Sequence, residues 1–233
     1  MAKKYDFTKG SIGKSLFYFS GPILLANLLQ TSYQFIDSLW VGNLLGANAL
    51  GAVAISGSIL FVVLSLIIGL NNAALTILSQ QKGKQNEEGL KRYLNAFVVL
   101  MTCIALLLGV SGFIFAEVLL NLLGTPEAML TDAAIYLRIN FIGILLLFGY
   151  NFISTVLRSI GDSKTPLYFV TAAVILNAVL DPLFIDTFGW GITGAGYATV
   201  VSQGFSFFAW FLLYCEEGSS SIYHPEYAKL ERD

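Results

Sequence analysis

Long apolar stretches dominate the chain and predict membrane-spanning helices. A span needs about 20 predominantly apolar residues. Barrel strands are about half that length and alternate between apolar and polar residues, which these stretches do not. The pattern predicts an all-α polytopic membrane protein, with 1–215 as a six-helix transmembrane unit and 216–233 as a polar tail or linker. The six predicted spans are 16–41, 53–79, 93–116, 134–158, 166–186 and 193–215.

The composition supports this prediction and argues against nucleic-acid binding, a histidine-rich metal site and a disulfide scaffold. Of the 233 residues, 56% are hydrophobic and only 12% are charged, about half the usual charged share of a soluble domain. The 13 basic and 15 acidic residues leave no basic surface for nucleic acid. His224 is the only histidine, which excludes a histidine-rich metal site, and Cys103 and Cys215 are too few for a disulfide scaffold.

The positions of the basic residues predict the orientation of the chain. Every Lys and Arg except Arg138 lies in the N-terminal arm, between 79 and 93, at or after the end of the span 134–158, or in the tail. Lys and Arg accumulate on the cytoplasmic side of membrane proteins. We therefore predict a multi-pass protein of the plasma (inner) membrane, in contact with its lipids, with both termini in the cytoplasm.

Two aspartates lie inside predicted spans, where a charge is expensive. Placing a carboxylate at the bilayer centre costs about 2.5–3.5 kcal/mol on insertion scales, so such residues usually face protein or a water-filled cavity. Asp37 and Asp181 both lie four to five residues before the outer end of their spans, which predicts similar depths. Two adjacent carboxylates cannot both stay ionised without a counter-cation, so we predict that they share a proton or a metal ion.

Polar residues continue from each aspartate along one face of its helix. Residues three, four or seven apart share a face, which aligns Gln30 and Gln34 with Asp37, and Asn177 with Asp181. Single Ser or Thr residues commonly connect helices by hydrogen bonds, but four stripes on four helices predict one wet interior. The other two stripes comprise Asn151, Ser154, Thr155 and Arg158 on one span, and Thr199, Ser202, Gln203 and Ser206 on another.

Two prolines interrupt the same two helices. Pro22 removes a backbone hydrogen bond within the span 16–41 and predicts a bend there, unless it lies in the first helical turn, where proline is tolerated. Pro182 follows Asp181 directly. It leaves the Ala178 carbonyl without its usual helical donor, so this carbonyl is a further candidate cation ligand.

Five sequence segments carry a resemblance to a known family. In this order and spacing they resemble the multidrug and toxin extrusion (MATE) transporters over about 15–214. The segments are GP at 21–22, FIDSLWVG at 35–42, LGANALGA at 45–52, LRSIGDSKTP at 157–166 and NAVLDPLF at 177–184.

The resemblance implies a function and a set of residues. It implies a polyspecific exporter of small organic cations, not an enzyme, driven by an inward proton or sodium gradient and requiring no other cofactor. Pro22 corresponds to the bending proline of the family. By position the coupling-ion site, which could hold sodium, comprises Asp37, Asn177, Asp181 and Thr199. The candidates for the substrate path are Gln30, Tyr33, Gln34, Asn151 and Gln203.

The length of the chain leaves alternatives open. MATE transporters have two six-span lobes, so this chain resembles the N-terminal lobe and would need a second lobe or a homodimer partner. A lipid-linked oligosaccharide flippase of the same superfamily is one alternative, although only Arg138 and Arg158 approach the membrane to meet a diphosphate. A non-transporting half-size membrane subunit is the other. An intramembrane aspartyl protease is disfavoured because neither aspartate has that class's flanking motif.

Overall fold

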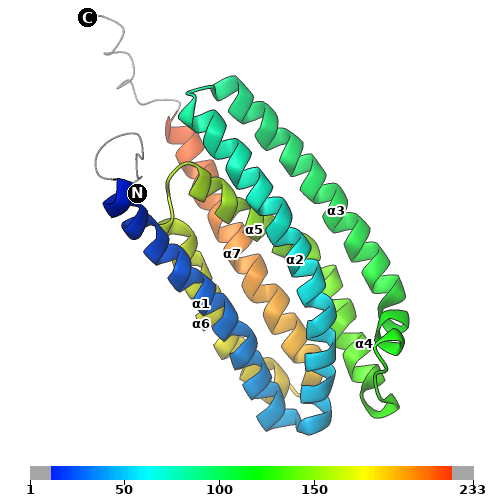
Figure 1. Cartoon of the computed structure of the whole chain (residues 1–233). Coiled ribbons are helices and arrows are strands. Elements are labelled where there is room, and N and C mark those ends of the chain that lie inside the picture. The colour runs from blue at the N-terminus through cyan, green and yellow to red at the C-terminus, as the bar shows by residue number, and fades with distance from the viewer. Residues whose placement is uncertain (1–11, 222–233) are drawn as a thin grey trace, which may run out of the picture.

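The chain folds into a bundle of long helices that run up and down side by side (Figure 1). The computed structural model describes residues 12–221, and this part contains helices and no strands, which confirms the predicted all-α class. The last helix continues through 216–221, where the sequence predicts a tail or linker, and the rest of that segment lies outside the described residues. The helices are α1 (Ile12–Leu45), α2 (Ala47–Gly83), α3 (Glu87–Leu122), α4 (Glu127–Ile142), α5 (Ile144–Ser159), α6 (Lys164–Pro182), the π-helix η1 (Leu183–Thr187) and α7 (Gly191–Ser221).

Each predicted span coincides with a helix or a pair of helices. Among the described residues, α2, α3 and α6 with η1 are long and apolar enough to cross a membrane, and α4 with α5 adds a fourth crossing when the pair counts as one span. Helices α1 and α7 have comparable lengths and carry the polar stripes predicted above. The number of six membrane crossings stays a prediction.

The span predicted as continuous over 134–158 is broken at Gly143. Here α4 and α5 meet at an angle of 50°, and the N–H of Leu146 donates to the Gly143 carbonyl (3.0 Å). The break lies against α7, because a Cβ added to Gly143 would come within 2.5 Å of the Val200 side chain. Glycine at this position therefore permits both the kink and the close approach of α7.

The two ends of the bundle differ in their loops. Figure 1 places the start of α1, the α2–α3 turn, the α5–α6 loop and the end of α7 at one end. Lys82 and Lys84 belong to this turn, and Lys164 begins α6 at the same end. The basic residues of the described loops thus gather at one end, as the charge pattern predicts. The basic residues of the N-terminal arm up to position 11 and those of the tail lie outside the described residues.

Apolar packing divides the bundle into two groups. The larger core joins α2, α3, α4, α5 and α7, and it also includes Val41 at the end of α1 and Ile185 of η1. The smaller core joins the middle of α1 to α6 around Ala26 and Val170, and these two helices lie side by side in Figure 1. Helix α1 passes through Pro22 as one continuous helix, so the proline does not break it.

Candidate functional site

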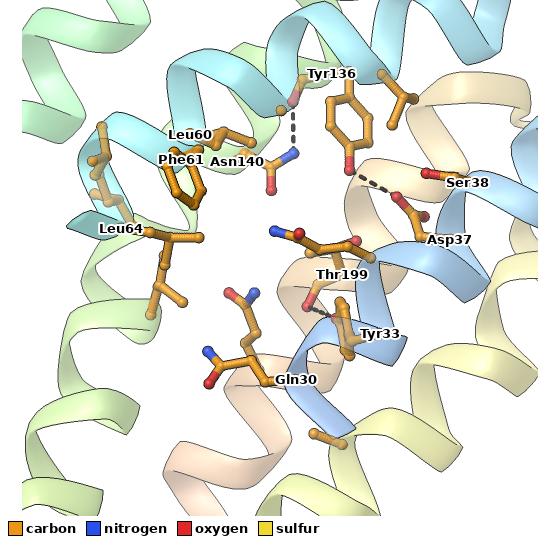
Figure 2. Close-up of a pocket in the computed structure, with 18 of the residues that line it drawn as sticks. Gln30, Tyr33, Asp37, Ser38, Leu60, Phe61, Leu64, Tyr136, Asn140 and Thr199 are labelled. Atoms are coloured by element: carbon orange, nitrogen blue, oxygen red, sulfur yellow. Dashed lines mark hydrogen bonds between the residues drawn. The ribbon is translucent and has the colours of Figure 1, made fainter. Parts of the chain in front are cut away.

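A cavity of about 510 Å³ opens between the two packing groups. Figure 2 shows that α1 presents Gln30, Tyr33 and Asp37 to it. Its opposite wall is apolar and includes Phe61 and Leu64 of α2. A polar-lined cavity therefore exists in the described structure, but only two of the four predicted polar stripes, those of α1 and α7, line it. The polar residues of the lining are Gln30, Tyr33, Gln34, Asp37, Ser38, Ser58, Tyr136, Asn140, Tyr150, Thr199, Gln203 and Ser206.

Asp37 lies at the wall of the cavity and is almost completely buried (4% exposed). The Tyr136 hydroxyl donates a hydrogen bond to Asp37 Oδ2 (2.9 Å; Figure 2). This bond connects α1 to α4, 99 residues away in the sequence. The other carboxylate oxygen, Oδ1, is buried without a hydrogen-bond partner in the described part of the protein.

Asp181 is fully buried and is not among the residues that line the cavity. Asn177, one turn earlier on α6, donates its Nδ2 to Asp181 Oδ1 (3.0 Å). Asp181 Oδ2 and Asn177 Oδ1 are buried and have no hydrogen-bond partner among the described residues. The carboxylate of Asp37 interacts electrostatically with that of Asp181. Their helices α1 and α6 pack side by side, but Asp37 alone lines the cavity predicted for both.

Thr199 of α7 connects to α1 through its backbone. The Tyr33 hydroxyl donates to the Thr199 carbonyl (3.1 Å; Figure 2). The Thr199 hydroxyl donates to the Ala195 carbonyl in its own helix (3.1 Å), which leaves its oxygen lone pairs available. Thr199 is buried at the cavity wall beside Tyr33.

The chain after Asp181 takes an unusual path. Pro182 ends α6, and the next five residues form the π-helix η1. The Trp190 N–H donates to the Phe184 carbonyl (3.1 Å) and holds the loop against η1. Gly194 of α7 packs so closely that an added Cβ would lie 2.7 Å from the Phe184 carbonyl carbon. Short π-helical segments often occur at functional sites, and this one follows the buried carboxylate directly.

The structure also shows two site residues that the sequence reasoning did not select. Tyr136 and Asn140 of α4 line the cavity, and the Asn140 amide donates to the Tyr136 carbonyl (2.9 Å). Their spacing of four residues inside an apolar stretch is a signal that could have identified them. Asn151 does not line the cavity, and its amide donates to the Leu147 carbonyl (2.8 Å). The bend at Gly143 explains the difference, since the two halves of this span point in different directions.

Comparisons with known proteins place the chain in a family. The MatE family model matches residues 22–183. The chain belongs to the MatE family. The probable multidrug resistance protein YpnP of Bacillus subtilis is 62% identical to it over 205 residues, which are 88% of this chain and 46% of the relative. This MatE chain therefore spans about half the length of that relative.

Solved structures of MATE transporters share the fold of this MatE protein. An outward-facing multidrug resistance MATE transporter of the MOP superfamily has a TM-score of 0.80 at 25% identity, over 85% of this chain and 44% of that one. An inward-facing structure of the same description has a TM-score of 0.74 at 26% identity, over 78% and 42%. The MatE chain thus has the architecture of a membrane transporter over about half of the length of these proteins.

Proposed function

We propose that this chain is the N-terminal lobe of a cation-coupled multidrug exporter and that it carries the coupling-ion site. One observation carries the proposal: three buried oxygens of α1 and α6 have no hydrogen-bond partner in the described protein. They are Asp37 Oδ1, Asn177 Oδ1 and Asp181 Oδ2. Buried acceptors without a partner cost about 1–3 kcal/mol each. A cation among them would remove that penalty.

The chemistry of these oxygens suits a proton or sodium. Carboxylate and amide oxygens are ligands for hard cations, and a proton shared between two neighbouring carboxylates removes their repulsion. Thr199 and the Ala178 carbonyl, which has lost its helical donor to Pro182, offer further oxygens. Among the described residues no three His, Cys, Asp or Glu side chains gather into a metal centre, so the ligands proposed here include neutral oxygens.

The hydrogen bond between Tyr136 and Asp37 connects the ion site to the cavity. Asp37 belongs to both, since it faces the cavity and lies within range of Asp181. Ion binding would neutralise the carboxylates, weaken the attraction of the cavity for an organic cation, and favour its release to the outside. A gradient can drive export only when the ion and the substrate have different affinities for the two transport states.

We also propose a partner that completes the transport path and an orientation of the chain in the membrane. A second six-helix lobe, or a second copy of this chain, would complete the transport path, because the chain spans 46% of its relative YpnP. The basic loops at one end of the bundle support an inner-membrane orientation with both termini in the cytoplasm. The cavity, whose lining contains no Lys or Arg, offers no basic partner for a diphosphate, which favours the exporter over the flippase.

The test uses the purified chain in detergent and its tryptophan fluorescence. Trp40 lies three residues from Asp37 and reports on the site. Sodium is titrated at fixed pH, and pH is then titrated without sodium, for the wild type, Asp37→Asn and Asp181→Asn. The matched control is Asp132→Asn, a carboxylate of α4 that does not line the cavity.

The outcomes separate the proposal from its alternatives. We expect a saturable response to one of the two ions that persists in Asp132→Asn and disappears in both site variants. A response that survives in Asp37→Asn and Asp181→Asn would show that these aspartates bind no coupling ion. The absence of any response in the wild type would contradict a complete ion site within this lobe.

A further inference from the structure

Three glutamine side chains face the cavity, and their amides make no hydrogen bonds to the described protein. Gln30 and Gln34 project from α1, and Gln203 projects from α7. In Figure 2, Gln30 points into the open centre of the cavity. Each amide offers one acceptor oxygen and two N–H donors, so the cavity presents both kinds of group to a ligand.

Asn140 adds a fourth amide with a defined orientation. Its Nδ2 donates one of its two N–H groups to the Tyr136 carbonyl (2.9 Å), which fixes the orientation of the amide. Figure 2 shows the oxygen on the other side of the amide, directed toward the open space. This oxygen is an acceptor that suits a ligand with N–H groups.

The charges of the residues that line the cavity favour a cationic ligand over an anionic one. Among the described residues, Asp37 is the only acidic one that lines the cavity, and no described Lys, Arg or His lines it. An anion would find no positive partner, whereas a cation finds one carboxylate. The apolar wall around Phe61 and Leu64 would contact a ring system. The cavity combines a carboxylate, an apolar wall and several free amides.

The free amides distinguish among cations. A site rejects a ligand that leaves its buried hydrogen-bonding groups unpaired. Gln203 and Asn140 are half-buried and Gln30 is exposed, so we expect a smaller discrimination than a fully buried site gives. We propose that Gln30, Gln203 and Asn140 select organic cations that bear amino groups over cations of the same ring and charge that lack them. This inference rests on the proposed function, since it names the substrate class of that cavity.

Two dyes with the same ring and charge test the inference. The probes are 3,6-diamino-10-methylacridinium and 10-methylacridinium, which differ only in their two amino groups. Equilibrium dialysis against the detergent-solubilised chain gives both dissociation constants, after subtraction of dye uptake by empty micelles. We expect the diamino dye to bind about tenfold more tightly, because one good hydrogen bond changes an equilibrium by about that factor.

The variants locate the source of this preference. In Gln30→Leu and in Gln203→Leu, which lie on different helices, the ratio of the two dissociation constants should fall toward one, while 10-methylacridinium keeps its affinity. The matched control Gln80→Leu changes an exposed glutamine outside the cavity and should keep the full ratio.

Several results would overturn the inference. A ratio near one in the wild type would show that water satisfies the amides as well as the dye does. An unchanged ratio in both variants, or equal losses for the two dyes, would show that the glutamines do not select amino groups. The ion titrations of Asp37→Asn and Asp181→Asn report on the proposed function separately, so that either conclusion can fail alone.

Discussion

Replacing Gly194 with alanine would place a methyl group against the backbone of the π-helix that follows Asp181. The added Cβ would lie 2.7 Å from the carbonyl carbon and oxygen of Phe184, and 3.0 Å from the nitrogen of Ile185. Ordinary van der Waals contact begins at 3.4 Å, so α7 and η1 must separate by about 0.7 Å, the difference between 2.7 and 3.4 Å. Backbone atoms cannot rotate away as a flexible side chain does.

The expected magnitude follows from comparison with a glycine that has free space. Overpacking costs about 1–3 kcal/mol. Gly57 in α2 also lies in a helix, and its added Cβ meets nothing within 4 Å. Alanine gains about 0.5–1 kcal/mol of helix propensity over glycine at either position. The difference between Gly194→Ala and Gly57→Ala therefore isolates the clash, and we expect Gly194→Ala to be less stable by about 1–3 kcal/mol.

Two measurements check this prediction on the purified chain in detergent. Thermal unfolding should place the transition of Gly194→Ala below that of Gly57→Ala. The fluorescence titration should also show weaker ion binding in Gly194→Ala, because the displaced π-helix is covalently joined to Asp181 through Pro182. Equal transition temperatures for the two variants would refute the reasoning about the packing of η1.

Three further substitutions test other contacts, each by thermal or denaturant unfolding of the purified chain. Ser56→Ala removes the hydrogen bond from a fully buried hydroxyl on α2 to the Ala133 carbonyl on α4 (3.1 Å). It should destabilise the chain by about 1–3 kcal/mol. The control Ser58→Ala, whose hydroxyl bonds within its own helix, should have little effect. Equal losses of stability in the two variants would contradict the role of the α2–α4 bond. Asp162→Ala removes the acceptor of the Lys164 and Thr165 N–H groups (3.1 and 3.0 Å). It should cost about 0.5–2 kcal/mol and accelerate hydrogen exchange in the first turn of α6, and unchanged exchange would argue against the cap. Arg138→Gln breaks the ion pair with Glu117 (3.0 Å); the two side chains are 36% and 56% exposed, respectively. The free energy of unfolding should fall by less than about 1 kcal/mol. A larger fall would show that this pair is more than a solvated surface contact.

The amino-acid sequence predicts well those features that depend on local periodicity. The lengths of the apolar stretches identify the helices, and helical spacing places Gln30, Gln34 and Asp37 on one face. The structure confirms that this face lines a cavity. The pairing of Asn177 with Asp181, four residues apart, also appears as a hydrogen bond. These features need only the geometry of one helix.

Features that depend on contacts between helices could not be predicted in this way. The break at Gly143 reflects the fit of that glycine against Val200, 57 positions away in the sequence. In a continuous helix Asn140 and Asn151, eleven residues apart, would share a face, but only Asn140 lines the cavity. The bond from Tyr136 to Asp37 joins helices 99 residues apart. The π-helix likewise depends on the close approach of Gly194.

The division of the apolar core into two groups has a consequence for how the cavity can change its width. Beside the cavity, two hydrogen bonds connect α1 to the larger group: Tyr136 to Asp37 and Tyr33 to the Thr199 carbonyl. Water can replace such bonds at a net loss of about 0.5–1.5 kcal/mol for the neutral Tyr33 bond and about 1.5–3 kcal/mol for the bond to an ionised Asp37. Val41 at the end of α1 packs in the larger core, and α6 packs along α7. The cavity therefore widens only if the wall formed by α1 and α6 pivots about these contacts, with its own apolar core intact, after the two exchangeable bonds open.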